Sequence, residues 1–203
     1  LSGVELGVLH ICTSSTTEAA AIELSTAMAT KMRRTDLNGS WILDKTREPW
    51  SMKNYLQVMN VDPMAVEAHE KGEKEHDTIH TITMDQQRIK IVKRSRVNND
   101  LVVELEFNKP LEVLLPPGNR PKRSLATTQG PAHVHIQNSM QTTNGLATVT
   151  DTKELVQEAN QTFMVQTLFI QNEQTRQNST TRRYFLPHQL DTTAKPAPGS
   201  AKK

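Results

Sequence analysis

The sequence contains few cysteines, few aromatic residues and no long apolar run, and each scarcity limits what the protein can be. It has one cysteine, Cys12, which excludes an internal disulfide and fits a reducing compartment, so we expect a cytoplasmic protein. No stretch approaches the roughly 20 apolar residues of a membrane-spanning helix. Two Trp, two Tyr and four Phe allow only a thin aromatic core, but 203 residues suffice for one domain with tails.

The sequence also lacks the motifs of several enzyme classes. It has no G-x-S-x-G nucleophile elbow, no phosphate-binding loop and no dinucleotide fingerprint. We therefore expect a protein that is not an enzyme and that needs no cofactor.

Two kinds of charged or ligating cluster point only weakly to function. The basic cluster consists of Arg94, Arg96, Arg120, Lys122 and Arg123. It has no interleaved aromatic residues, so we interpret it as surface charge and expect no nucleic-acid partner.

The pairs His76-x₃-His80 and His133-x-His135 resemble fragments of a zinc site. Structural zinc sites usually need four closely spaced ligands, often cysteines. We expect no metal there, and interpret these histidines as polar cavity residues or surface residues.

The two ends of the chain differ in composition from the middle. Ser, Thr and Ala dominate Ser14–Thr30, and Glu18–Met32 favours a helix, so residues 1–36 are predicted to be a flexible or partly helical extension. Its glutamates argue against a signal or transit peptide. Residues 188–203 are rich in Pro and Lys and are predicted to be disordered, which leaves 37–187 as the folded domain.

The order of elements in this domain is one strand, two short helices and nine strands. Gly39–Lys45 is a predicted strand with Trp41 in the core. Apolar residues at helical spacing predict a helix over 52–59 with Ser51 as N-cap, and Asp62-Pro63 begins a second one. Alternating apolar and polar residues then predict nine strands: Thr78–Met84, Arg88–Arg96, Leu101–Phe107, Leu111–Leu115, Pro121–Thr128, His133–Met140, Ala147–Glu154, Thr162–Asn172 and Asn178–Leu186. Their even spacing and short turns predict an antiparallel meander that closes on itself.

The last predicted strand, NSTTRRYF, carries the most suggestive chemistry. Side chains alternate along a strand, so it presents two sets on opposite faces: Thr180, Arg182 and Tyr184, and Thr181, Arg183 and Phe185. If the first set faces inward, the guanidinium of Arg182 and the phenol of Tyr184 could hold a carboxylate together. The alternative is a solvated edge strand with Arg182 in water.

These features together resemble the intracellular fatty-acid-binding proteins, small β-clams related to the cellular retinoid binders. GSWILDK resembles the family's opening strand, and residues 54–61 resemble its first helix and turn, where Asn60 replaces the usual Gly. Thr181-Arg182-Arg183-Tyr184 fits the family's Thr-Arg-x-Tyr carboxylate motif. The resemblance covers Asp36–Pro187. It implies a ten-stranded antiparallel up-and-down β-barrel with a two-helix lid between the first and second strands.

The resemblance also implies a function and a set of binding residues. A monomeric carrier would enclose a long-chain fatty acid or similar amphipathic carboxylate, with the carboxylate held by Arg182 and Tyr184. Other candidate ligand contacts are His135, Gln137, Thr152, Ser95, Val97, Met59 and Met64. Lys53 and Lys71 on the lid could touch anionic membranes transiently, although a solvated face is the commoner role for such lysines.

One departure from the family leaves a second hypothesis open. The family's other arginine, two strands before the Arg-x-Tyr strand, has no counterpart, and Thr150, Asp151 and Thr152 occupy that region. An inward Asp would repel a fatty-acid headgroup, whereas an inward Thr could donate to it. The alternative is therefore a non-catalytic barrel that serves as an interaction or structural module of a larger assembly.

Overall fold

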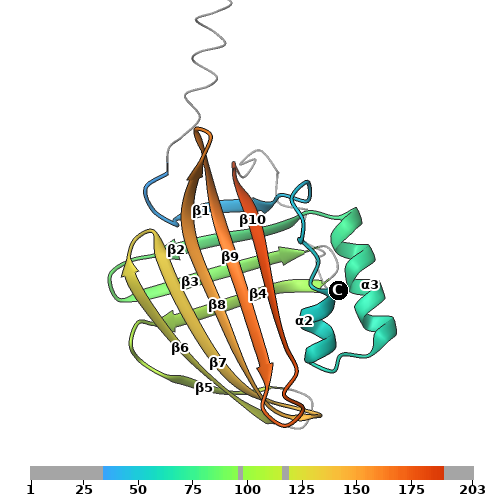
Figure 1. The fold of residues 1–203 in the computed structure, drawn as a ribbon. Coiled ribbons are helices and arrows are strands. Elements are labelled where there is room, and N and C mark those ends of the chain that lie inside the picture. Colours follow the sequence, from blue (N-terminus) through green and yellow to red (C-terminus); the bar gives the residue numbers. More distant parts are fainter. Residues whose placement is uncertain (1–33, 96–97, 116–118, 190–203) are drawn as a thin grey trace, which may run out of the picture. The chain divides into compact units, whose positions relative to one another are not determined.

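The computed structural model describes residues 34–95, 98–115 and 119–189, and within them the predicted fold is confirmed (Figure 1). Ten antiparallel strands form a nearly closed barrel, and two helices lie between the first two strands in the chain. The elements are β1 (Gly39–Leu43), α2 (Lys53–Val58), α3 (Pro63–Glu75), β2 (Thr78–Met84), β3 (Arg88–Ser95), β4 (Asn98–Glu106), β5 (Leu111–Leu115), β6 (Arg120–Gly130), β7 (His133–Thr142), β8 (Gly145–Glu158), β9 (Gln161–Asn172) and β10 (Asn178–His188).

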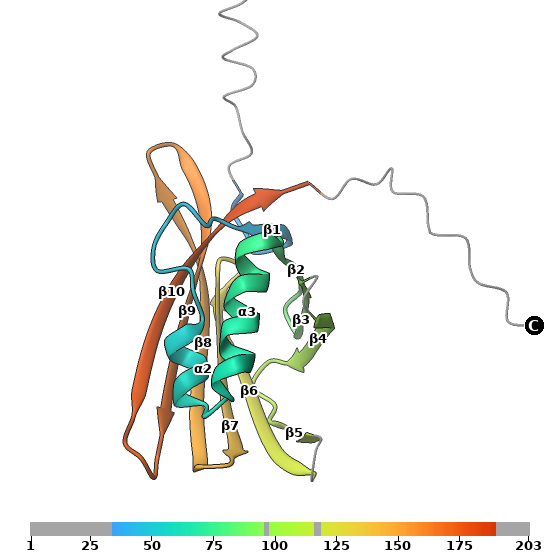
Figure 2. The same cartoon turned by 90° about the vertical axis from the view of Figure 1, so that its right-hand side faces the viewer.

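The strands follow the order β4-β3-β2-β1-β10-β9-β8-β7-β6-β5, so consecutive strands of the chain are neighbours in the sheet, except β4 and β5. The pairing of β1 with β10 joins the two ends of the meander. β4 and β5 do not pair with each other, and a bridge from Phe107 to Ala126 spans that gap at one point. The helices pack against each other, and α2 also packs against β9 and β10 (Figure 2).

Local sequence signals account for the helical lid. Asp62 caps α3, accepting hydrogen bonds from the backbone N–H groups of Met64 at 2.9 Å and Ala65 at 3.4 Å, while Pro63 occupies the first helical position. Between the helices Asn60 has a φ of 58°, in the left-handed region that favours Gly or Asn. Its amide donates to Thr143 Oγ1 at 2.9 Å, which ties the lid to the turn between β7 and β8.

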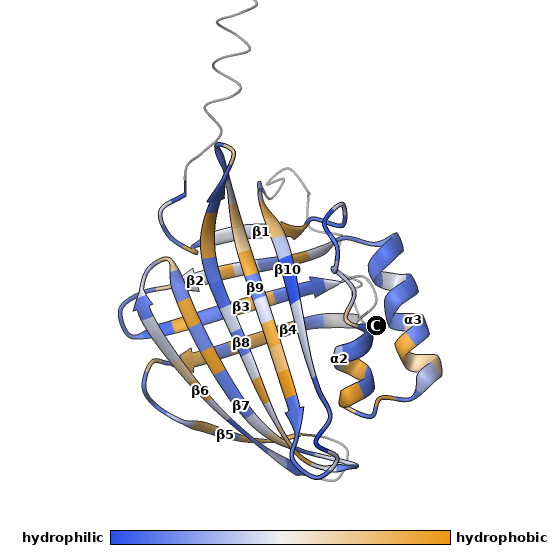
Figure 3. Cartoon of the chain, in the orientation of Figure 1, coloured by the Kyte–Doolittle hydropathy of each residue, from blue (hydrophilic) through white to orange (hydrophobic). Residues whose placement is uncertain are grey.

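The buried apolar side chains of the barrel form two clusters. Figure 3 shows hydrophobic and hydrophilic residues alternating along most strands, as expected for one inward and one outward face. The larger cluster of buried residues comprises Leu37, Trp41, Leu43, Ile82, Ile89, Ile91, Leu105, Ala126, Val134, Ile136, Met164 and Phe185. A smaller cluster of Ala147, Val149 and Ile170 packs under α2. Each large side chain buried in this way contributes roughly 1.5–3 kcal/mol to stability.

Candidate functional site

A cavity of about 330 Å³ lies inside the barrel, lined by both helices and by strands from both halves of the sheet. Its volume is at the lower end of the range of about 300–1,000 Å³ found for ligand pockets. Ile136, Val149 and Leu168 contribute apolar wall, while charged side chains from α3, β3, β6, β8 and β10 line the rest. The cavity therefore offers both an apolar surface and ionic groups.

The orientation of β10 is opposite to the predicted one. Arg182 is exposed and its guanidinium lies 5.4 Å from the Tyr184 ring on the outer side, whereas Arg183 is buried and lines the cavity. Tyr184 packs on the outer side as well, with its ring edge-on to Phe163 at 5.9 Å. The predicted inward pair of Arg182 and Tyr184 is thus wrong by one residue, and Phe185, 0% exposed, is the inward aromatic residue.

The physical reason is that a strand shifted by one residue exchanges its two faces completely. In TTRRYF both faces carry a Thr, an Arg and an aromatic ring, so polarity barely distinguishes them. The phenylalanine ring is the one that can be buried without losing a hydrogen bond, and it stacks on His80 at 4.6 Å between ring centroids.

Arg183 forms an ion pair with the lid. Its Nη2 lies 2.5 Å from Oε1 of Glu73, and both side chains are at most 5% exposed. Thr78 Oγ1 donates to the same carboxylate oxygen at 3.3 Å. One buried salt bridge therefore connects α3 to β10 in the wall of the cavity. The sequence did not indicate it, because Glu73 and Arg183 lie 110 positions apart in the chain.

A second network of polar side chains extends across the barrel interior. Asp151 Oδ1 accepts from Lys153 Nζ at 2.5 Å and from Gln166 Nε2 at 3.0 Å, and its Oδ2 lies 3.5 Å from Lys93 Nζ. Lys93 belongs to β3 and Asp151 to β8, which are not neighbours in the sheet, so this contact spans the cavity.

The two ionised partners on β8 respond to burial differently. Burial alone would raise the pKa of Asp151, but the ammonium groups of Lys153 and Lys93 outweigh that effect and lower the pKa well below its usual range. Burial lowers the pKa of Lys153 to about 8 despite the neighbouring carboxylate. At pH 7 the pair is charged and held inside the barrel.

His80 gives a prediction about acid stability. Burial, followed by the nearby charges of Lys93, Lys153 and Arg183, lowers its pKa well below 6.5, while Asp151 opposes the shift. The unfolded chain takes up a proton near pH 6.5 and the native chain does not, so stability should fall as pH falls below 6.5. We expect a loss of roughly 1 kcal/mol per pH unit, measured by urea unfolding between pH 7 and pH 5.

The matched variant for this prediction is His80→Gln, which should lose the part of the pH dependence that the imidazole causes. His135→Gln, at a half-buried imidazole on β7, serves as control. Equal slopes for wild type and His80→Gln would contradict a buried neutral His80.

The other predicted contacts on β7 and β8 also face away from the cavity. Gln137 is exposed, and His135 Nδ1 lies 3.1 Å from Thr152 Oγ1 across the strand pair. None of the three lines the cavity, so their predicted inward placement is wrong. The alternation of Val134 and Ile136, both buried, places the intervening histidine and glutamine outside, and this signal was readable in the sequence.

Of the remaining predicted ligand contacts, some line the cavity and some do not. Ser95 lines the cavity, as expected. Met59 packs beside the small apolar cluster under α2, and Met64 is 79% exposed, so neither contributes to the cavity wall. Val97 lies outside the described residues.

The basic cluster predicted to be surface charge is partly internal. Lys122 lines the cavity, and burial followed by the charge of Lys93 lowers its pKa. Arg94 and Arg123 are exposed as expected. The sequence indicated this for Lys122, because side chains two positions apart share one face of a strand and the next residues on that face of β6, Ser124 and Ala126, are buried.

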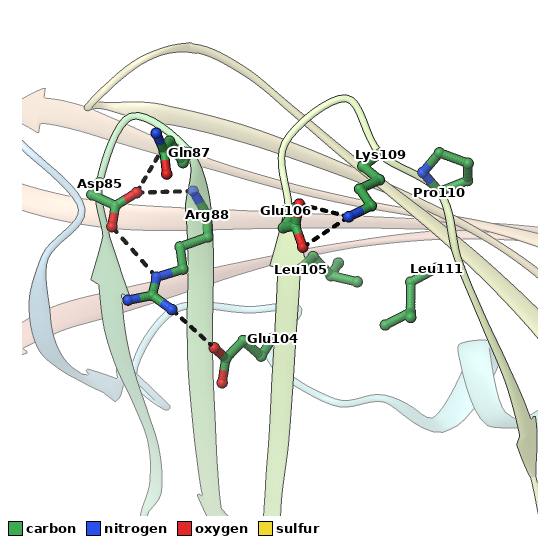
Figure 4. Close-up of a pocket in the computed structure, with 9 residues that line it drawn as sticks. All are labelled: Asp85, Gln87, Arg88, Glu104, Leu105, Glu106, Lys109, Pro110 and Leu111. Atoms are coloured by element: carbon green, nitrogen blue, oxygen red, sulfur yellow. Dashed lines mark hydrogen bonds and ion pairs between the residues drawn. The ribbon is translucent and has the colours of Figure 1, made fainter.

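A larger hollow of about 540 Å³ lies between the β2–β3 turn, the end of β4 and the connection from β4 to β5 (Figure 4). Its charged side chains are exposed and already paired: Arg88 with Asp85 and Glu104 at 3.5 and 3.7 Å, and Lys109 with Glu106 at 3.0 Å. Exposed pairs of this kind are well solvated, so the interior cavity is the better candidate site.

Among the residues that the structure describes, no group of three or more His, Cys, Asp or Glu side chains could hold a metal ion. Over the same residues, no helix has the length and apolar character needed to cross a membrane.

Comparison with known proteins identifies the fold. No protein-family model matches the chain, and no curated sequence is significantly similar to it. Among solved structures, apo lipid-binding protein 8 of Caenorhabditis elegans matches with a TM-score of 0.55 at 14% identity, over 78% of this chain and 99% of that one. A Schistosoma mansoni fatty acid-binding protein in complex with arachidonic acid matches with a TM-score of 0.54 at 14% identity, over 76% and 98%.

A third similar structure is not named as a lipid-binding protein. Secretory abundant heat soluble protein 4 of Ramazzottius varieornatus matches with a TM-score of 0.53 at 7% identity, over 78% of this chain and 99% of that one. Identities this low show the architecture alone. The chain therefore has the calycin-like barrel fold of the fatty-acid-binding proteins.

Proposed function

We propose that the barrel binds and carries an amphipathic acid, such as a long-chain fatty acid, in the cytoplasm, with the hydrocarbon tail inside the cavity. The observation that supports this most is the combination of an apolar wall with the buried Arg183 and the half-buried Lys93 and Lys122 around one hollow. Burying a tail contributes roughly 0.8 kcal/mol per CH₂ group, so the tail supplies most of the affinity. Nothing in this scheme requires a covalent step.

The headgroup contact is assigned to the inward arginine. Arg183 lines the cavity, and its Nε has no hydrogen-bond partner among the described residues. A ligand carboxylate would have to share this guanidinium with Glu73 or replace it. A charge-assisted hydrogen bond of this kind contributes about 1.5–3 kcal/mol.

Titration calorimetry with oleate and oleyl alcohol tests the proposal. Because Arg183→Met alone would leave Glu73 buried without a cation, the informative variant is Glu73→Gln/Arg183→Met. We expect it to bind oleate about tenfold more weakly or worse than wild type, and to bind oleyl alcohol equally well.

The matched control is Arg182→Met, on the same strand but exposed, which should change oleate affinity less than about twofold. Loss of oleate binding in Arg182→Met but not in the double variant would contradict the assignment. Absence of binding by wild type to any amphipathic acid would contradict the carrier function itself.

A second candidate function also has an observation in its favour. The side chains of Lys93 and Asp151 meet across the cavity. Such a contact stabilises the barrel and occupies space that a ligand would need. A structural or interaction module would use the barrel in this way, and calorimetry without any ligand signal would favour it.

A further inference from the structure

The charges that line the cavity do not balance. Glu73 has its own cation, Arg183, at 2.5 Å, and Asp151 has Lys153 at 2.5 Å. These two buried pairs are neutral as units. Arg94 also lines the cavity and is paired with Asp100 at 3.0 Å. Lys93 shares Asp151 at the longer distance of 3.5 Å, so one carboxylate faces two ammonium groups and one positive charge is in excess.

A second excess charge belongs to Lys122. It lines the same cavity from β6 and has no ion-pair partner among the described residues. Burial and then the charge of Lys93 lower the pKa of Lys122, while Asp151 raises it, so Lys122 interacts with both charged groups through the cavity. Two cations that repel each other in a half-buried site favour an anion between them.

Hydrogen-bond donors accompany these cations. Asn138 lines the cavity from β7, beside β6, and its Oδ1 accepts from Ser124 Oγ at 2.8 Å. With its oxygen engaged, the amide nitrogen of Asn138 has two N–H groups to donate. The phenol of Tyr55 also lines the cavity, and burial raises its pKa above the ordinary value, so its O–H donor is retained.

We propose that the headgroup preferred by this cavity is a dianion, a phosphate monoester, held between Lys93 and Lys122. A phosphate monoester carries about −1.5 to −2 charges at pH 7 and has three strong acceptor oxygens, which matches two excess cations and neutral donors. A fatty-acid carboxylate, which the proposed function assigns to Arg183, carries one charge and would leave both lysines without a ligand anion. The inference rests on the proposed function, since the alkyl tail is assumed to occupy the apolar wall.

Titration calorimetry at pH 7.5 can distinguish the contributions of headgroup charge, headgroup shape and alkyl tail to ligand affinity. The probes are dodecyl phosphate, its monoanionic diester dodecyl methyl phosphate, dodecanoate and inorganic phosphate. We expect dodecyl phosphate to bind about tenfold more tightly than dodecanoate or the diester. Inorganic phosphate should bind much more weakly than dodecyl phosphate, because it has no tail to bury.

The variant Lys93→Gln/Lys122→Gln should abolish the preference for dodecyl phosphate over dodecanoate. Lys90→Gln/Arg123→Gln removes exposed charges from the same two strands and should leave the preference intact. Melting curves of both double variants verify that they are folded.

The outcomes separate the two claims. Equal affinity for dodecyl phosphate and dodecanoate would overturn the dianion site while leaving the carrier function standing. Equal binding of inorganic phosphate and dodecyl phosphate would show a site for the free anion and would also overturn the lipid inference. No binding of any probe would overturn both.

Discussion

Replacing Arg183 by methionine should lower the free energy of unfolding by about 3–5 kcal/mol, because the substitution leaves the carboxylate of Glu73 buried without a cation. Glu73 is 3% exposed, and without Arg183 its carboxylate would keep only the Thr78 hydroxyl at 3.3 Å from Oε1 and the His69 imidazole at 3.9 Å from Oε2. Urea unfolding at pH 7.5, analysed for the midpoint and the slope, measures this loss.

Two further variants show that the loss comes from the ion pair. Adding Glu73→Gln to Arg183→Met should restore most of the stability, since a neutral pair removes the buried charge. Arg182→Met, one residue away on the exposed face, should change stability by less than about 0.5 kcal/mol. A larger loss from Arg182→Met than from Arg183→Met would show that β10 has the opposite orientation.

Replacing Asp151 by asparagine should have an effect of similar size. Lys153 is 0% exposed, and its ammonium group would lose the carboxylate that now lies 2.5 Å away. A buried ammonium without a partner costs about 3–5 kcal/mol or shifts toward its neutral form. Urea unfolding at pH 7 should therefore show a strongly lowered midpoint for Asp151→Asn.

The compensating variant for this second pair is Asp151→Asn/Lys153→Met, which should recover most of the lost stability. Asp100→Asn is the matched control, because Asp100 forms an exposed ion pair with Arg94 and should contribute little. If Asp151→Asn proved as mild as Asp100→Asn, the ionic network inside the barrel would not exist as described.

The fold was predictable because its signals are local. Asp62-Pro63 is sufficient to start α3, and Trp41 is recognisable as the core residue of β1, where its Nε1 donates to Leu37 O at 2.8 Å. The alternation of apolar residues and the turns of Asn and Gly determine the other strands. The prediction for Ser51 is met only in part: α2 has Met52 at its N-cap, but Ser51 Oγ accepts from the backbone N–H of Lys53, the first residue of the helix, at 3.1 Å.

The site was predicted less well because the family motif selected one of two faces of β10 that polarity alone barely distinguishes. The Thr-Arg-x-Tyr pattern selected Arg182, whereas the buried set on β10 contains Arg183. On β8, Val149 is buried and therefore places Asp151 and Lys153 inside. The ion pair of Glu73 with Arg183 depends on how the lid meets the barrel, and no pattern within either segment specifies that contact.

The most direct test of an anion-binding interior is a crystal structure with a fatty acid brominated near its tail, since anomalous scattering locates the bromine. We predict bromine inside the barrel against Ile136, Val149 and Leu168, with the carboxylate near a buried cation and not near Arg182. Bromine found only on the outer surface beside Arg182 and Tyr184, or no bound acid in a barrel filled by its own side chains, would contradict this account.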